Sequence, residues 1–527
     1  MPSRPKHTHT FALVSFSTMA PPGRSLNELM QAAEANLKRL RAEQASRSGN
    51  KLIDRYRKME DAPLEYTTRT ADQEVDTVEI CPTNRDYMII GTYSLVKQED
   101  RRDYEAQTRR GTIQVMTVHP EFKPLYAGML PPQLDRISFP CAVLDIHFHP
   151  ADGTLLGVAT SNAHVYFFRF IKHGDVLGRR VITKLLQLGS VRVSEDDEHG
   201  LTPLVTQFTW FPEVRSHGVL GISDVQDVSF AATTSFGETR FINTCVPLIK
   251  DLFDERANEP PADLPIIVTN VHKHDLEAWT VAAVTLRSTR QSQDNSIYRM
   301  ILSGGDDSAL IASAIAFSCS PLQPGSSAIS SSDEFEPNPM PLWKDRRNHT
   351  AGVVAILPLP SNDASPIPHP RKTVITGSYD EYLRIFEIDT KTHRAIWKAE
   401  LRFGGGVWRL KVLDQYTTTT VDDSATRQES AHHHSLILAS LMHGGAAVIR
   451  LTYSADVDSW TITPLTTFRA GHESMVYCCD GKLETGAEGA PPTYTIVSTS
   501  FYDMKICTWK FVDHFKAQQG QQGQLLA

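Results

Sequence analysis

Side chains that could do acid–base chemistry stand singly in this sequence, each just before or just after a short β-type run. Glu277 and Asp306 carry carboxyl groups, and His443 carries an imidazole, which ordinarily titrates near neutral pH. These three residues and the cationic Arg409 are the candidate catalytic groups. Aromatic faces attract cations, and a glycine lets the backbone approach a ligand closely. The candidate substrate-binding residues are accordingly Trp279, Tyr379, Gly405, Trp408 and Tyr502.

General catalytic and metal-binding motifs are missing from the chain. It contains no G-x-S-x-G nucleophile elbow, no G-x-x-x-x-G-K-[ST] phosphate loop and no H-E-x-x-H zinc motif. The run 432–434 consists of three histidines, but no further ligands follow at metal-site spacing. We therefore predict a solvated loop there, with no metal and no cofactor. Any chemistry then depends on how the fold gathers the single residues.

The elements that must gather these residues are short strands, and the strands repeat. The clearest copies are Leu302–Leu310, Ile375–Leu383 and Val497–Lys505, each a strand, a tight turn closed by Asp and a second strand. Weaker copies begin at Met88, Gly157, Phe230 and Leu438. Seven copies predict an all-β, seven-bladed WD40-type β-propeller over residues 61–515. In such a ring the loops before the inner strands and the turns after the second strands share one face. We expect the candidate residues to converge there.

A histidine precedes each of the three clearest turns by about 30 residues. The pairs are His274 with Asp307, His349 with Asp380, and His472 with Asp503. This resembles the WD-repeat pattern, in which the histidine hydrogen-bonds the turn aspartate within its blade. A buried carboxylate needs such donors, so we predict that the three pairs are structural. The blade of His443 has Gly445 in place of the aspartate, which favours His443 as a base.

The two ends of the chain differ from the repeats. Residues 1–60 form an extension in which a capping pattern and apolar periodicity predict a helix at about 25–45. Residues 516–527 are a polar tail, which leaves the last blade one strand short. We predict that the strand-like run 64–69 supplies the missing strand. The polar stretches 253–264, 321–341 and 415–434 are predicted to be loop insertions.

Composition limits the class of function. Lys and Arg number 53 against 61 Asp and Glu, and the net charge of −8 disfavours direct nucleic-acid binding. Seven cysteines without a C-x-x-C pair indicate reduced thiols, and no apolar run is long enough to span a membrane. We expect a monomeric, cytoplasmic protein without a membrane association.

Together the motifs resemble the diphthine methylesterase family, WD-repeat enzymes of diphthamide biosynthesis that are also called diphthine methyltransferases. The similarity spans roughly residues 64–512, with motifs in successive blades. The most specific motifs are His274-x-x-Glu-Ala-Trp279, Ser303-Gly-Gly-Asp-Asp307, Thr376-Gly-Ser-Tyr-Asp-Glu381, Gly404-Gly-Gly-Val-Trp-Arg409, Met442-His443 and Ser500-Phe-Tyr-Asp503. Asp76-x-Val-Glu79 with Cys81-Pro82, and Gly91-Thr-Tyr93, match the first blade of the family. The strand from Met475 to Asp480 departs from the family pattern, because the usual Gly and Trp that follow are missing.

The resemblance implies a substrate and a reaction. The substrate would be translation elongation factor 2 that carries a methylated diphthine as a methyl ester, and hydrolysis would give diphthine and methanol without a cofactor. His443 would take a proton from the attacking water, with Glu277 and Asp306 as alternatives or as groups that orient the base. Arg409, Tyr379, Tyr502 or the backbone amides around 404–406 would stabilise the oxyanion. Trp279 or Trp408 would contact the trimethylammonium group.

A non-catalytic WD-repeat adaptor that binds a protein partner is the alternative function. A cluster of titratable groups at the mouth of the ring would favour the enzyme. A broad apolar or charged rim without such a cluster would favour the adaptor.

Overall fold

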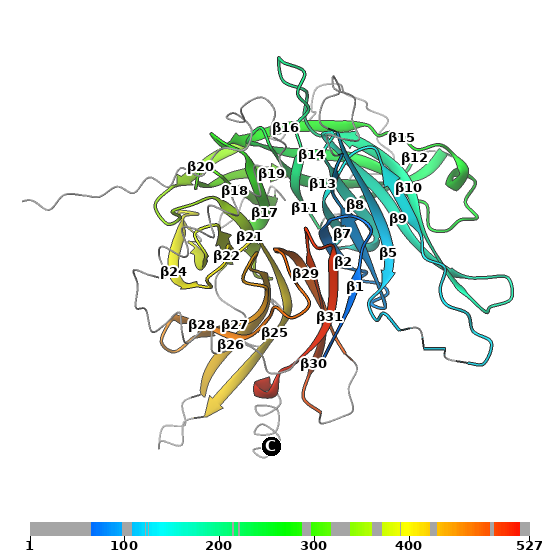
Figure 1. Cartoon of the computed structure of the whole chain (residues 1–527). Helices are drawn as coiled ribbons and strands as arrows, with labels where there is room; N and C mark the ends of the chain where they lie inside the picture. Colours follow the sequence, from blue (N-terminus) through cyan, green and yellow to red (C-terminus); the bar gives the residue numbers. More distant parts are fainter. Residues whose placement is uncertain are drawn as a thin grey trace, which may run out of the picture.

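The computed structural model describes residues 65–96, 108–121, 123–124, 126–212, 215–219, 222–286, 297–317, 338–360, 372–389, 391–421, 429–484 and 490–516. Nearly every element within them is a strand, and the strands form seven small sheets. Figure 1 shows the sheets following one another around a central axis, from the blue blade to the red one. The prediction of an all-β, seven-bladed propeller is confirmed. The helix expected at about 25–45, the extension 1–60 and most of the tail 516–527 lie outside the described residues.

The first strands of neighbouring blades contact one another around the axis, so they form the inner ring of the propeller. These inner strands are β2 (Val75–Ile80), β7 (Val143–His149), β11 (Val205–Trp210), β17 (Ala278–Leu286), β21 (Val353–Pro358), β25 (Arg409–Val421) and β29 (Val476–Leu483). The second strands are β3 (Tyr87–Thr92), β8 (Asp152–Thr160), β13 (Ile222–Thr234), β18 (Ile297–Gly305), β22 (Lys372–Ser378), β26 (Glu429–Ser440) and β30 (Thr493–Ser500).

The outer half of each blade consists of a third and a fourth strand. The third strands are β5 (Arg109–Thr117), β9 (His164–Gly174), β14 (Glu238–Pro247), β19 (Leu310–Phe317), β23 (Tyr382–Ile388), β27 (Ala446–Ser454) and β31 (Lys505–Val512). The fourth strands are β6 (Arg136–Phe139), β10 (Val181–Arg192), β16 (Ile266–Lys273), β20 (Met340–Asp345), β24 (Ala395–Arg402), β28 (Ser459–Phe468) and β1 (Tyr66–Thr70). Three short strands join these sheets at their margins, namely β4 (Ser94–Leu95), β12 (Arg215–Val219) and β15 (Ala262–Asp263).

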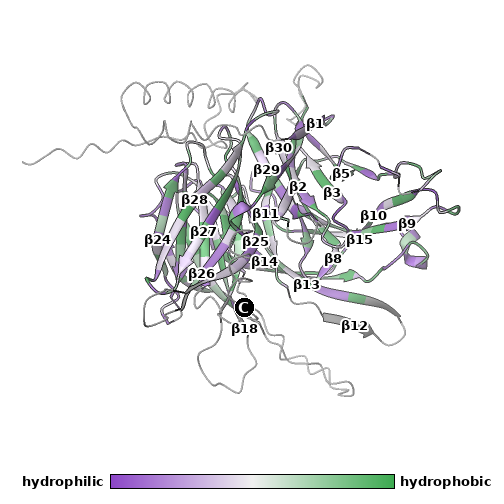
Figure 2. Ribbon diagram, turned by 90° about the horizontal axis from the view of Figure 1, so that it is seen from below, coloured by the Kyte–Doolittle hydropathy of each residue, from purple (hydrophilic) through white to green (hydrophobic). Residues whose placement is uncertain are grey.

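Burial differs between the second and the fourth strands. Every residue of β3 is buried, and so are all but the first of β30, because both faces of these second strands are covered by neighbouring blades. The fourth strand β24 is mostly accessible. Figure 2 shows apolar and polar residues distributed along the strands of the blades.

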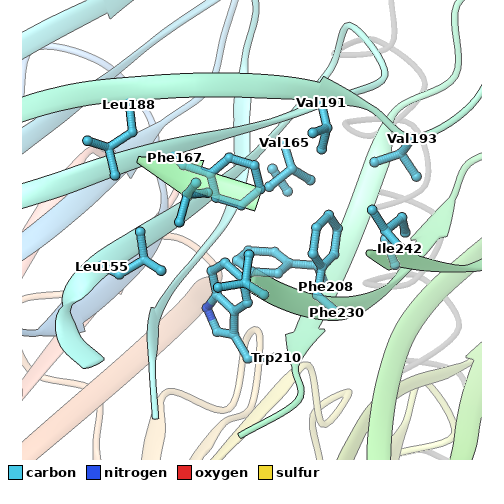
Figure 3. Close-up of a cluster of buried hydrophobic side chains, with 14 of the residues drawn as sticks. Leu155, Val165, Phe167, Leu188, Val191, Val193, Phe208, Trp210, Phe230 and Ile242 are labelled. Atoms are coloured by element: carbon cyan, nitrogen blue, oxygen red, sulfur yellow. The ribbon is translucent and has the colours of Figure 1, made fainter. Parts of the chain in front are cut away.

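Aromatic side chains fill the space between blades two and three (Figure 3). The ring centroids of Phe208 and Trp210 lie 5.4 Å apart, and Phe230 lies 5.9 and 5.7 Å from them, all edge to face. Gly157 borders this cluster, and a Cβ there would come within 2.7 Å of the Phe208 ring. The glycine therefore allows β8 to approach the rings of the next blade.

The first and last strands of the chain lie side by side in the same sheet. β1 pairs antiparallel with β31, from Tyr66 opposite Trp509 to Thr70 opposite Lys505. Figure 1 shows this as blue β1 beside red β31. The residues expected to close the ring, 64–69, overlap β1. Two segments more than 400 residues apart thus complete one blade, and the outer edge of β31 is covered.

The turn aspartates are anchored in the same way in three blades. Each accepts the backbone N–H of the residue after the histidine. The donors are Asp275 to Asp307 at 3.2 Å, Thr350 to Asp380 at 3.0 Å and Glu473 to Asp503 at 2.7 Å. These bonds tie each turn to the loop before the inner strand, which is the structural role predicted for the aspartates.

The expected direct His–Asp hydrogen bond forms only in blade four. His274 Nδ1 lies 2.8 Å from Asp307 Oδ1. His349 instead bonds the Thr376 hydroxyl, and His472 bonds the Ser498 and Ser500 hydroxyls. The direct bonds predicted for His349–Asp380 and His472–Asp503 are corrected accordingly. Their carboxylates have other donors, since backbone N–H groups serve both, Arg384 also binds Asp380 and Ser474 also binds Asp503.

Two of the predicted loop insertions are structured. Residues 253–264 include a 3₁₀ turn at Glu255–Asn258 and strand β15. The described parts of 415–434, residues 415–421 and 429–434, belong to the paired strands β25 and β26, in which His432 lies opposite Thr418. His434 is buried and its ring lies 4.9 Å from that of Tyr416, so the solvated loop expected for 432–434 is wrong. The Thr and His side chains pack against side chains of the neighbouring strands. Polar composition alone does not reveal this packing.

The described cysteines are free thiols, and Cys319 lies outside the described residues. Within the described residues, no helix has the length and apolar character needed to cross a membrane.

Trp509 lies opposite Tyr66 of the closing strand β1 and packs between blades six and seven. Its indole N–H donates to Ser498 at 3.1 Å, and its ring stacks on Phe468 at 4.9 Å. We predict that Trp509→Ala lowers the free energy of unfolding by about 3–5 kcal/mol, because a buried indole is lost. The matched control is Trp397→Ala, at a tryptophan that is 47% exposed, with an expected change within about 0.5 kcal/mol. Denaturant titration of both variants measures the difference, and equal effects would contradict the packing described.

Candidate active site

Six of the seven inner strands shift register at their second residue. In blade four, for example, the shift between Ala278 and Thr280 leaves Trp279 without a partner on β18. The residues at these bulges are Asp76, Leu144, Thr206, Trp279, Val354 and Tyr477. A bulge releases its extra residue from the ladder and redirects the side chain. One equivalent residue per blade is thereby placed at the same end of the ring.

Trp408 occupies the equivalent place in blade six. Val407, just before it, packs against Gly377 as Val353 packs against Gly304 in the preceding blade. The Trp408 N–H donates to Ser440 O at 2.8 Å. Blade six therefore contributes a tryptophan to the same ring of positions.

The turns after the second strands meet the starts of the inner strands at this end. The first turn residue donates its N–H to the carbonyl just before the inner strand in several blades. Asp306 donates to Glu277 O at 2.9 Å, Tyr379 to Gly352 O at 3.0 Å, and Phe501 to Met475 O at 3.0 Å. This repeated bond places Asp306 beside Glu277, and it brings Tyr379 and Phe501 to the same end of the axis.

The aromatic rings from these positions form a continuous group centred on Trp408. Its centroid lies 5.9 Å from Trp279, 5.8 Å from Tyr379 and 5.3 Å from Tyr477. Trp279 belongs to blade four and Trp408 to blade six, so their contact spans blade five and must lie toward the axis. Phe501 continues the group at 4.7 Å from Tyr477. Tyr502 follows at 5.1 Å from Phe501, toward the edge of the group.

Charged groups lie among these rings. The Arg409 guanidinium lies 5.6 Å from the centroid of the Trp408 ring, within cation–π range. Glu277 is buried. We refer to the residues that meet here as the axial cluster; they are Glu277, Trp279, Asp306, Tyr379, Trp408, Arg409 and Tyr477.

Two carboxyl groups at this end titrate far above their ordinary range. Burial raises the pKa of Asp306 to about 7, with Glu277 and Asp307 adding to the rise and the Trp279 indole opposing it. Burial also raises the pKa of Asp76 to about 7, although Arg409 opposes the rise. Such groups populate both protonation states at neutral pH, which is what acid–base catalysis requires. Burial likewise raises the pKa of Tyr379 and of Tyr477, so both phenols stay neutral.

Gly405 and His443 lie at the margin of the axial cluster. A Cβ on Gly405 would lie 2.2 Å from Leu441 O, so its small size serves packing of the 404–406 loop against the turn 441–445. Gly405 was predicted to let the backbone approach a ligand, but this packing of the two loops also explains why a glycine is needed there. His443 sits in that turn next to Met442, which packs against the aromatic group, and its carbonyl accepts a hydrogen bond from Arg469 at 2.6 Å.

The structure therefore brings together Glu277, Trp279, Asp306, Tyr379, Trp408 and Arg409 from the predicted set, with Tyr502 and His443 beside them. Sequence reasoning missed Asp76, Tyr477 and Phe501 as parts of this end of the axis. A signal was present, because a small apolar residue precedes most bulge positions, as in Val75-Asp76, Ala278-Trp279, Val407-Trp408 and Val476-Tyr477. Among the described residues, no group of three or more His, Cys, Asp or Glu side chains is arranged to hold a metal ion.

A second set of charged side chains follows one step further along the inner strands, and its members are paired. His147 lies 3.0 Å from Glu79 and 3.1 Å from Asp145, and Lys411 lies 2.6 Å from Asp480. Several of these side chains also bind the next blade, as when Asp480 accepts the N–H of Ile80 at 2.7 Å. This set stabilises the ring rather than offering groups to a ligand.

The closed ring of seven blades and the Trp–Ser–His network of the last blade define a WD-repeat type of β-propeller, here with an acidic and aromatic cluster at one end of its axis. Among curated proteins, the chain is similar to the diphthine methyltransferase of Schizosaccharomyces pombe, with 24% identity over 448 residues that cover 84% of this chain and 97% of the relative. It is also similar to the diphthine methyltransferase of Saccharomyces cerevisiae, with 25% identity over 247 residues, 45% of this chain and 49% of the relative. These comparisons confirm the resemblance inferred from the motifs, and no family model matches the chain.

His147 gives a test of the paired set. Burial lowers its pKa, but Asp145 and Glu79 outweigh this and raise it to about 10. Because the folded pKa exceeds the unfolded value of about 6.5, the stabilisation is complete below pH 6.5 and is lost as pH rises through 10. We predict that His147→Gln lowers the free energy of unfolding at pH 6, and that the gap to the unchanged protein narrows toward pH 10. His199→Gln, at a side chain 75% exposed, is the control; a gap for His147→Gln that does not change with pH would contradict the pairing.

Proposed function

We propose that this chain hydrolyses the methyl ester of methylated diphthine on translation elongation factor 2, giving diphthine and methanol. The printed name of its relatives, diphthine methyltransferase, supports the coarser statement that it has a role in diphthamide biosynthesis. The axial cluster supports the finer one, because it combines groups suited to each part of such a substrate. We place the reaction in the cytoplasm, with elongation factor 2 as the protein partner.

The observation that carries the proposal is the grouping of three aromatic rings with two carboxyl groups. The Trp408 ring lies 5.9 Å from Trp279 and 5.8 Å from Tyr379. Glu277 and Asp306 stand beside Trp279. Aromatic faces bind quaternary ammonium groups, and adjacent carboxylates strengthen the attraction. A trimethylammonium group is therefore the ligand that this side of the cluster fits best.

Arg409 and Asp306 provide the groups that ester hydrolysis needs. A water molecule attacks the ester carbonyl carbon while Asp306 takes its proton, and the new C–O bond leaves an oxyanion beside the Arg409 guanidinium. Collapse of this intermediate breaks the bond to the methoxy group, which leaves with a proton as methanol. Among the proton acceptors expected from the sequence, we assign Asp306 ahead of His443 and Glu277, because its pKa of about 7 suits the transfer and it lies against the aromatic group.

Cells that lack this protein test the function. We predict that mass spectrometry of their elongation factor 2 shows persistent methylated diphthine, and that reintroducing the full chain restores diphthamide. Normal diphthamide in these cells would reject the proposal. Methylated diphthine that persists in the cells but is not converted by the purified protein would favour the adaptor instead.

Asp306→Asn tests the assigned base. Because the base must be ionised, the methanol-release rate of the unchanged protein should fall as pH drops below about 7. The variant should be about 100-fold slower at pH 7.5 and should lack this fall. Asp251→Asn, at an exposed carboxylate, is the control. Near-normal release by Asp306→Asn, together with a large loss in His443→Ala or Glu277→Ala, would reassign the base.

A further inference from the structure

Asp76 shares the bulge position of Trp279 and Tyr477 but has no role in the fold or in the reaction as described so far. The shift between Val75 and Thr77 frees it from the ladder with β3. Blade one is the neighbour of blade seven across the closure, and β2 contacts β29. Asp76 therefore reaches the same end of the axis from the side opposite blade four.

The surroundings of Asp76 connect it to the axial cluster. Its charge interacts with those of Arg409 on β25 and Asp145 on β7. It also raises the pKa of Tyr477 on β29 and of Tyr93, the residue after β3, whose hydroxyl accepts a hydrogen bond from Arg109 at 3.0 Å. The charge of Asp306 raises the pKa of Tyr379, and that of Arg409 lowers it. Asp76 thus occupies in blade one the bulge position that Trp279 and Tyr477 occupy in blades four and seven, within electrostatic range of Arg409.

Asp76 differs from the structural carboxylates that lie near it. Glu79, Asp145 and Asp480 each have an ion pair within 3.1 Å. Within the described residues, neither the Asp76 carboxylate nor the Arg409 guanidinium forms an ion pair or a side-chain hydrogen bond, although each feels the charge of the other. The Asp76 side chain is only partly buried, so a ligand can reach its carboxyl group. Both groups therefore keep hydrogen-bonding capacity that the described residues do not use.

We propose that Asp76 is a catalytic residue of the proposed hydrolysis, the carboxylic acid that protonates the departing methoxy oxygen beside Arg409. The inference rests on the proposed function. In this step the bond between the carbonyl carbon and the methoxy oxygen breaks, and the oxygen takes the proton of the Asp76 carboxyl group to form methanol. Asp76 becomes a carboxylate and regains a proton from solvent, while Asp306 releases to solvent the proton it took from water. The net change is one water consumed, with one methanol, one carboxylate and one proton formed.

The roles of Asp76 as the acid and Asp306 as the base agree with their pKa values. Asp76 and Asp306 both have a pKa of about 7, so near neutral pH one can be protonated while the other is ionised. An acid on one side and a base on the other side of a substrate is the arrangement that other hydrolases build from two carboxyl groups. Activity should then fall on both sides of neutrality, because the base is lost at low pH and the acid at high pH.

The experiment compares Asp76→Asn and Asp76→Glu with the unchanged full-length protein, using elongation factor 2 that carries methylated diphthine. For Asp76→Asn we expect kcat about 100-fold lower, KM within about threefold, and loss of the decline above pH 7. Asp76→Glu keeps the carboxyl group and should recover part of the rate and the decline. Asp480→Asn, at a paired carboxylate, is the contrast for a structural role.

The unfolding temperature distinguishes a catalytic role of Asp76 from a structural one. Because the folded protein disfavours the ionised form of Asp76, Asp76→Asn should unfold at the same or a higher temperature at pH 8. Asp480→Asn should unfold at a lower temperature, because it removes the ion-pair partner of Lys411. A folded Asp76→Asn that keeps its rate or its alkaline decline would overturn the assignment, and so would an activity loss explained by a lowered unfolding temperature. If the unchanged protein released no methanol, the proposed function would fail and the role of Asp76 with it.

Discussion

Closure of the ring by the pairing of β1 with β31 is the constraint on which the site depends. The inner strands of seven blades meet around one axis only if the first blade contacts the last, as β2 contacts β29. The side chains of the axial cluster come from blades four, five, six and seven, and Asp76 comes from blade one. Blade one meets blade seven only through this closure, because each blade is held mainly by its neighbours. The chemistry at the axis is therefore a property of the whole ring.

Within the closed ring, one register shift repeated in the inner strands decides which side chains meet. The shift places Asp76, Trp279 and Tyr477 at equivalent points, and the bond from Asp306 N–H to Glu277 O adds the turn residues. A step further along, His147 and Lys411 pair with carboxylates and link the blades. The residues at the bulge positions and the paired residues further along the strands differ in one respect that matters for function. The carboxylates that pair with His147 and Lys411 stabilise the fold. Asp76, by contrast, has no ion pair or side-chain hydrogen bond in the part of the chain that the structure describes.

Repeats in the sequence were sufficient to predict the blades, because a strand, a tight turn and an aspartate recur along the chain. They also predicted the meeting of Glu277, Asp306 and Trp408, since loops and turns of a propeller share a face. Asp76 could not be separated from an ordinary strand residue without the register shift, which depends on pairing across β2 and β3. The His349–Asp380 and His472–Asp503 bonds were predicted wrongly because these imidazoles bond serine and threonine hydroxyl groups instead. The pairing of residues 415–421 with 429–434 was hidden by their polar composition, as tertiary context overrides local preference.

Hydrolysis in water labelled with ¹⁸O tests the central proposal most directly. Purified protein would be incubated with elongation factor 2 that carries methylated diphthine, without any added methyl donor or acceptor, and both products would be analysed by mass spectrometry. Attack of water at the ester carbonyl predicts one ¹⁸O atom in the diphthine carboxylate and unlabelled methanol. Label in the methanol, or loss of the methyl group without label in either product, would contradict hydrolysis at the axial cluster as described.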